Sequence, residues 1–99
     1  MTASLQQINP KRMALEGVLN RHTVGPLRAD FSKYLKGADS CIELDLEKVG
    51  QSTSVGLSLL LCYVRKAKKT NKTLTLVNMP HKLFEMARVS GLDDVLPLG

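Results

Sequence analysis

The stretch VGQSTSVGLSLLLCYVRKAKKTNKTLTL, Val49 to Leu76, places three hydroxyl residues directly before the most apolar segment of the chain. Side-chain oxygens of Ser and Thr accept hydrogen bonds from the free backbone N–H groups at a helix start. We therefore expect a helix over 55–69 with Ser54 as its N-cap. The first half of that helix is apolar nearly all round, which predicts burial on more than one side.

The segments that flank this helix have the pattern of strands. Residues 73–77 follow a turn at Asn71 and are rich in residues that favour strands. Residues 41–46 alternate, so their isoleucine and leucines should share one face, while Cys41, Glu43 and Asp45 share the other. The two carboxylates on one face raise the question of acid–base chemistry, but a half-solvated strand face explains them better.

The first third of the chain predicts a hairpin and a helix. Residues 5–8 and 12–19 should form two strands joined by a turn at Asn9-Pro10, and Gly17 marks a bulge or a close approach. Thr23 is the expected cap of the next helix, which should end at Gly37. One helical face then carries four residues expected in the core: Val24, Leu27, Phe31 and Leu35.

The last third predicts one more helix. Asn78 is its expected cap, Pro80 suits an early helical position, and Gly91 should end it. Its apolar stripe comprises Leu83, Phe84 and Ala87, joined by Met86 or Val89. Val95 and Leu96 form either a short last strand or a packed tail.

The predicted order β-β-α-β-α-β-α implies an α/β domain with parallel crossovers and helices over the sheet. A length of 99 residues fits one domain over residues 1–99. Because 43% of the residues are hydrophobic but only 4% are aromatic, the core must be largely aliphatic. Cys41 and Cys62 are expected there as small buried hydrophobes.

Positive charge is concentrated near the end of the long helix. The chain has a formal net charge of +5, and its main source is the segment that holds Arg65, Lys66, Lys68, Lys69 and Lys72. Cations there complement the helix dipole, so a solvated helix end explains them. The alternative is a surface that binds anionic lipid or nucleic acid, which predicts strongly salt-sensitive binding.

Motifs of catalytic, metal and cofactor sites do not match the sequence. The glycines form neither a P-loop nor a dinucleotide fingerprint. His22 and His81 stand alone near helix starts, and the cysteines lack metal-ligand spacing. The segment around Ser52 departs from the G-x-S-x-G nucleophile motif at its last position. We therefore expect no catalytic residue, metal or cofactor, and a protein that is not an enzyme.

A phosphate at the helix start is a separate hypothesis. The first N–H groups of a helix lack internal partners and the dipole is positive there. A phosphorylated Ser54 would add roughly −1.5 to −2 charges at that point and change any surface that docks there.

Three segments resemble the STAS domain family over nearly the whole chain. LEGVLNRHTVGPL (15–27) resembles its second strand and first helix, CIELDLEKVGQSTSVGLSLLL its central strand and loop, and MPHKLFEMARVSGLDDVLPL its closing segment. The family loop reads Asp-Ser-Ser/Thr-Gly-Leu, and here it is Thr53-Ser54-Val55-Gly56-Leu57. Ser54 matches the hydroxyl that is phosphorylated in anti-sigma factor antagonists, while Thr53 replaces the Asp and Val55 the second hydroxyl.

The resemblance implies a STAS-like α/β fold with a mixed sheet of four to five strands and about three main helices. The stand-alone size and the altered loop are most like family members that serve as cytoplasmic subunits of the Mla phospholipid-transport ABC complex. That role implies binding to the ATPase subunit and through it to the permease, with no nucleic acid, no membrane span and a location at the inner membrane through the partner. The alternative is an anti-sigma factor antagonist regulated by phosphorylation at Ser54.

The resemblance also implies a docking surface. In such folds the turn after the central strand lies beside the exposed side of the first helix. The expected partner-binding residues on these two segments are Ser52, Thr53, Ser54, Val55, His22, Leu27 and Arg28.

Overall fold

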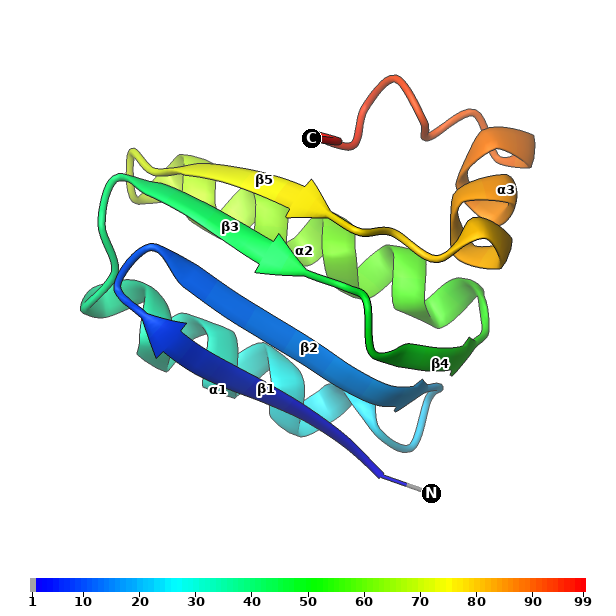
Figure 1. The fold of residues 1–99 in the computed structure, drawn as a ribbon, viewed down its shortest axis with the longest axis horizontal. Helices are drawn as coiled ribbons and strands as arrows, with labels where there is room; N and C mark the ends of the chain where they lie inside the picture. The colour runs from blue at the N-terminus through cyan, green and yellow to red at the C-terminus, as the bar shows by residue number, and fades with distance from the viewer. Residues whose placement is uncertain (1) are drawn as a thin grey trace.

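In the computed structural model, which describes residues 2–99 and leaves Met1 outside, five strands form one mixed sheet and the two longest helices cover one of its faces (Figure 1). The strands are β1 (Ala3–Asn9), β2 (Arg12–Leu19), β3 (Cys41–Asp45), β4 (Val49–Ser52) and β5 (Thr73–Val77). The helices are α1 (Val24–Lys36), α2 (Ser54–Lys69) and α3 (His81–Val89). The predicted α/β architecture is confirmed.

The sheet divides along one edge of β2. β1 pairs with β2 in antiparallel fashion, and β2, β3 and β5 run parallel in that order. β3 pairs with the first residues of β2 (12–14), whereas β4 pairs with its last ones, Gly17 with Val49 and Leu19 with Ser52. β3 and β4 therefore lie end to end along β2, and beyond β3 the sheet opens between β4 and β5 (Figure 1).

Strand β4 is the element that the sequence did not predict. Its four residues have only one buried side chain, Val49, and include Gly50. Such a short, mostly exposed segment lacks the alternation by which strands are found. Its pairing with β2 is imposed by the chain path from β3 into α2, so the observed order is β-β-α-β-β-α-β-α.

Gly17 confirms the expected close approach of another element. Its φ is +97°, and a Cβ atom there would collide with Thr2 O and lie 2.8 Å from Ala3 Cα. Its N–H donates to Lys48 O at 3.1 Å on the other side. The backbones on both sides of β2 therefore meet at this residue, which only glycine can occupy without strain.

The caps predicted for α1 and α3 do not form the expected side-chain hydrogen bonds. Thr23 holds the N-cap position of α1, as predicted, but has nearly helical dihedrals, so its hydroxyl points back, accepting from Asn20 N at 3.0 Å and donating to Val18 O at 2.8 Å. Asn78 has a φ of +56° and donates its amide to Asp45 Oδ1, while Pro80 holds the N-cap position of α3. The predicted end is confirmed, because Gly91 follows α3 with a φ of +72°.

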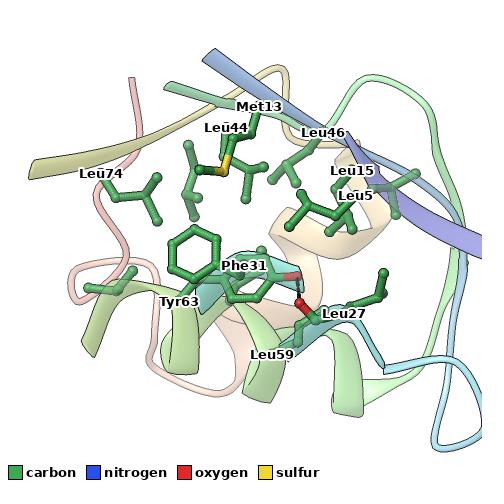
Figure 2. Packing of buried hydrophobic residues seen from close by; sticks show 14 of the residues in the cluster. Leu5, Met13, Leu15, Leu27, Phe31, Leu44, Leu46, Leu59, Tyr63 and Leu74 are labelled. Atoms are coloured by element: carbon green, nitrogen blue, oxygen red, sulfur yellow. Dashed lines mark hydrogen bonds between the residues drawn. The ribbon is translucent and has the colours of Figure 1, made fainter. Parts of the chain in front are cut away.

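The core lies between the sheet and the α1–α2 layer (Figure 2). Phe31 of α1 and Tyr63 of α2 stack with ring centroids 4.0 Å apart, and the Tyr63 hydroxyl donates to Leu27 O at 2.9 Å. The four residues predicted for the buried face of α1 are all buried. Burial raises the pKa of the Tyr63 phenol far above its ordinary value.

Some predicted core positions are exposed instead. Cys41 is exposed on the open face of the sheet and Cys62 is only half-buried, so their assignment as buried hydrophobes is wrong. The strand alternation had placed Cys41 beside Glu43 and Asp45, and that pattern outweighs the preference of cysteine for burial. On α3, Met86 packs against the core, whereas Val89 is 81% exposed.

The chain ends along the free edge of β5. Leu76 N donates to Pro97 O and Gly99 N donates to Leu76 O, both at 2.8 Å, so Leu98 bridges to the strand. Leu96 is buried and Val95 is 57% exposed. Among residues 2–99, none of the helices combines the length and apolar character needed to cross a lipid bilayer.

Candidate functional site

Residues Ser52–Val55, here called the α2 junction, lie at the edge of the sheet where the parallel strands end. Leu19 pairs with Ser52, and Thr53 N donates to Leu19 O at 3.0 Å, which ties the junction to the end of β2. The chain also leaves β2 at Leu19 to begin α1 at Val24. The starts of α1 and α2 therefore lie at the same edge, at the right of Figure 1.

Thr53, not Ser54, caps α2. Thr53 has extended dihedrals (φ −87°, ψ 178°), and its Oγ1 accepts from Val55 N at 3.3 Å. Ser54 is the first residue of the helix, and its side chain is exposed. The predicted cap was one residue too late, because three consecutive hydroxyl residues offer the same chemistry. Ser54 is thus on the surface, at the positive end of the helix dipole.

Gly56 allows the junction to pack closely against the sheet. A Cβ atom there would collide with Ser52 Oγ and lie 3.3 Å from Leu19 Cδ1. Ser52 itself is half-buried and donates its hydroxyl to Thr53 O at 2.9 Å. The Gly56-Leu57 pair noted in the sequence therefore seats α2 on β2, and this contact fixes where Ser54 emerges.

The predicted site residues of α1 do not all reach the surface. His22 is exposed and its N–H donates to Asn20 Oδ1 at 2.8 Å, in the turn before the helix. Leu27 is 2% exposed and belongs to the core, so its side chain is not available to a partner. Arg28 is exposed but lies beside α2, where Lys66 of the last helical turn donates its Nζ to the Arg28 carbonyl at 3.1 Å.

A hollow of about 420 Å³ adjoins the α2 junction, where the sheet opens between β4 and β5. One wall comes from the ends of β2 and β4 and the other from α3. Its lining residues are Val18, Leu19, Asn20, Gly50, Gln51, Ser52, Thr53, Pro80, Lys82, Leu83 and Met86. The sequence prediction missed this hollow because one of its walls is β4, a strand that was not predicted. On α3 the sequence indicated only an apolar stripe, to which Leu83 and the alternative Met86 belong.

The two carboxylates on the sheet face are held in an ion-pair network. Arg12 contacts Glu43 Oε1 at 2.6 Å and Asp45 Oδ2 at 2.9 Å. Hydrogen bonds from the Glu47 backbone and the Asn78 side chain, with that from Arg12, hold the pKa of Asp45 below its ordinary value. Both carboxylates are thus paired acceptors, as a half-solvated strand face predicts. Within residues 2–99, no group of three or more His, Cys, Asp or Glu side chains is placed to hold a metal ion.

Comparison with known proteins places the chain in one family. Residues 4–97 match the family model "Mlab, STAS domain". The chain is 35% identical over 86 residues to the "Intermembrane phospholipid transport system binding protein MlaB" of Escherichia coli (strain K12), a match that covers 86% of each protein. The protein of the same name from Shigella flexneri matches to the same extent.

Solved structures share the fold. The anti-sigma factor antagonist SpoIIAA in its unphosphorylated form superposes with a TM-score of 0.74 at 22% identity, covering 98% of this chain and 87% of that one. An anti-sigma factor antagonist from Mycobacterium paratuberculosis gives a TM-score of 0.78 at 20% identity, covering 97% and 82%. At these identities the likeness concerns the fold alone.

Proposed function

The chain belongs to the STAS domain family, and from that membership we propose that it is a non-catalytic, single-domain subunit of an ABC phospholipid transporter that maintains outer-membrane lipid asymmetry. In this proposal it binds the ATPase subunit, and through it the permease, at the cytoplasmic side of the inner membrane. The observation that supports this proposal most directly is the similarity to the MlaB proteins, which extends over most of this chain and most of each relative.

The α2 junction is the proposed centre of the docking surface. Thr53 and Ser54 are exposed there, and Val55 is half-exposed. His22 adds an exposed side chain at the start of the neighbouring helix. An ordinary interface buries about 800 Å² and 20–30 residues on each partner, more than this cluster supplies. We therefore extend the docking surface to α3 and to the hollow beside it. The largely apolar lining of the hollow suits the buried centre of an interface.

Isolation of the tagged chain from its own cells tests this function. The expected result is that an ABC ATPase and its permease copurify in fixed proportion and are identified by mass spectrometry. Recovery of an anti-sigma kinase as the principal partner, with no transporter subunit, would contradict the proposal.

The second candidate function is that of an anti-sigma factor antagonist switched by phosphorylation. The observation in its favour is that Ser54, which matches the phosphorylated hydroxyl of that class, is exposed at a helix start. It requires ATP-dependent transfer of a phosphoryl group to Ser54. Incubation with the anti-sigma kinases of the same cell should then add the mass of one phosphate, and an unchanged mass on this residue would eliminate this function.

A further inference from the structure

The positive charge of the molecule resides on its helical layer. α1 and α2 together carry seven of the 14 Lys and Arg residues but only one of the nine Asp and Glu residues, Asp30. Their net charge of +6 exceeds the +5 of the whole chain, so the rest of the molecule is slightly negative. The cations of this basic layer are Arg28, Lys33, Lys36, Arg65, Lys66, Lys68 and Lys69.

These cations belong to one helical layer, and all of them except Lys66 are exposed. Lys66 lies between the two helices, where its Nζ donates to Arg28 O and, at 2.7 Å, to Ser32 Oγ. The helices lie side by side on the same face of the sheet (Figure 1), and the molecule measures 31 × 30 Å across and 20 Å through its layers. The basic layer is therefore one of the two wide faces.

On the opposite face one cation meets two carboxylates, because Arg12 pairs with both Glu43 and Asp45 across neighbouring strands. The charge asymmetry is thus a property of the fold and not only of the overall composition.

The makeup of the basic layer distinguishes between partners. The fully buried centre of a protein interface is apolar and its rim is polar, but the large hydrophobic residues exposed in the described chain, Ile8, Val89, Val95 and Leu98, all lie outside α1 and α2. Single-stranded nucleic acid is bound by stacking on aromatic side chains. Phe31 of α1 and Tyr63 of α2 are buried, and Tyr34 of α1 is half-buried and packs against the core. A broad cationic face with no fully exposed apolar or aromatic anchor matches an anionic lipid surface, which attracts proteins through charge alone.

We propose that the basic layer adsorbs to the anionic headgroups of a phospholipid bilayer. Binding is peripheral, and the Lys and Arg side chains meet lipid phosphates with no helix inserted. This inference stands apart from the proposed docking to an ATPase, because it concerns the outer faces of the helices and can be tested on the isolated chain.

The strength of this adsorption follows from the number of cations. Each Lys or Arg near an anionic bilayer strengthens binding by roughly fivefold. Removal of four exposed cations should therefore weaken binding by at least about a hundredfold. The attraction should also fall as the screening length shrinks from about 10 Å at 0.1 M salt to about 3 Å at 1 M.

Vesicle cosedimentation with two matched variants tests the proposal. The layer variant carries Gln at Lys33, Lys36, Arg65 and Lys69, and the control variant carries Gln at Lys11, Arg21, Lys48 and Lys82, all exposed positions. Each loses four positive charges, so only the location of the charge differs. The vesicles contain either pure phosphatidylcholine or phosphatidylcholine with about one-third phosphatidylglycerol, a content that gives an anionic surface. Circular dichroism checks folding, and the paired variants Lys33→Gln/Lys36→Gln and Arg65→Gln/Lys69→Gln replace the layer variant if it unfolds.

The expected result is that wild type and control variant sediment with the anionic vesicles at low salt and not with the neutral ones, while the layer variant stays in solution. Each paired variant should lose roughly 25-fold in binding. The proposal is overturned if wild type ignores anionic vesicles, or if the control variant loses as much binding as the layer variant. Binding of wild type to a short DNA duplex without binding to vesicles would equally overturn it, by assigning the basic layer to nucleic acid.

Discussion

Replacement of Gly17 by Ala tests how the fold positions the α2 junction. Gly17 stands near the end of β2, paired with Ala3 of β1 on one side and with Val49 of β4 on the other. Its φ of +97° is one that L side chains rarely adopt, and the new Cβ would meet the backbone of Thr2 and Ala3. A backbone neighbour cannot rotate away, so the start of β1 must shift.

The cost of Gly17→Ala has two parts. A non-glycine residue at positive φ costs about 1–2 kcal/mol. Displacement of β1 also breaks the hydrogen bond from Val18 N to Thr2 O, observed at 3.0 Å, which contributes about 0.5–1.5 kcal/mol. The free energy of unfolding should therefore fall by about 1.5–3.5 kcal/mol, a large share of the 5–15 kcal/mol that is typical of a domain.

Urea denaturation followed by circular dichroism measures this loss, with two other glycines as controls. Gly91 has a φ of +72° but no atom within 4 Å of a new Cβ, so Gly91→Ala should cost only the strain of about 1–2 kcal/mol. Gly25 in α1 has neither strain nor a close neighbour, and Gly25→Ala should stabilise by up to about 1 kcal/mol. If Gly17→Ala costs no more than Gly91→Ala, the close approach of β1 has been misjudged.

Three further predictions concern stability. Thr53→Ala should lower the free energy of unfolding by about 0.5–1 kcal/mol through loss of the helix cap, whereas Ser54→Ala should leave it nearly unchanged; equal losses in urea would contradict the cap assignment. Tyr63→Phe should cost about 1 kcal/mol through loss of the buried hydrogen bond to Leu27 O. Because burial raises the pKa of Tyr63, this phenol should not ionise in the folded protein, so the variant and wild type should show the same tyrosinate absorbance until they unfold. The pKa of Asp45 is lower in the folded state than its unfolded value of about 3.9, so the ionised carboxylate stabilises the fold above that pH. This stabilisation is lost as the pH falls through the folded pKa. Asp45→Asn should therefore lose less stability than wild type between about pH 5 and pH 2, and equal losses in the two proteins would refute this.

The elements with a strong hydrophobic period were predictable, and short-range details were not. Strand β2 has the predicted bounds, and the buried face of α1 is the predicted one, because these patterns reflect burial directly. Strand β4 has one buried residue and exists because β2 offers a free edge there. Pairing with a free edge is a tertiary effect that local sequence does not encode.

The site was predicted only in outline, again because local sequence does not encode tertiary packing. The hydroxyl run marks the start of α2, but which hydroxyl caps depends on backbone dihedrals that a run of equivalent residues leaves open. Leu27 was assigned both to the core and to the docking surface, and only the packing of Tyr63 on α1 decides for the core. The hollow required knowledge of where the sheet opens, which follows from strand order.

Titration of the purified ATPase subunit with wild type, Ser54→Asp and Ser40→Asp chains tests the docking surface most directly. An acidic residue in the first turn of α2 complements the helix dipole, so Ser54→Asp should remain folded and any loss of binding reflects the surface. Ser40 is also exposed but precedes β3 at the opposite edge of the sheet, which makes its variant the matched control for added charge. We expect at least a tenfold weaker affinity for Ser54→Asp, a loss of about 1.4 kcal/mol, and unchanged affinity for Ser40→Asp. Equal affinities for Ser54→Asp and wild type would contradict the assignment of the α2 junction as the docking surface.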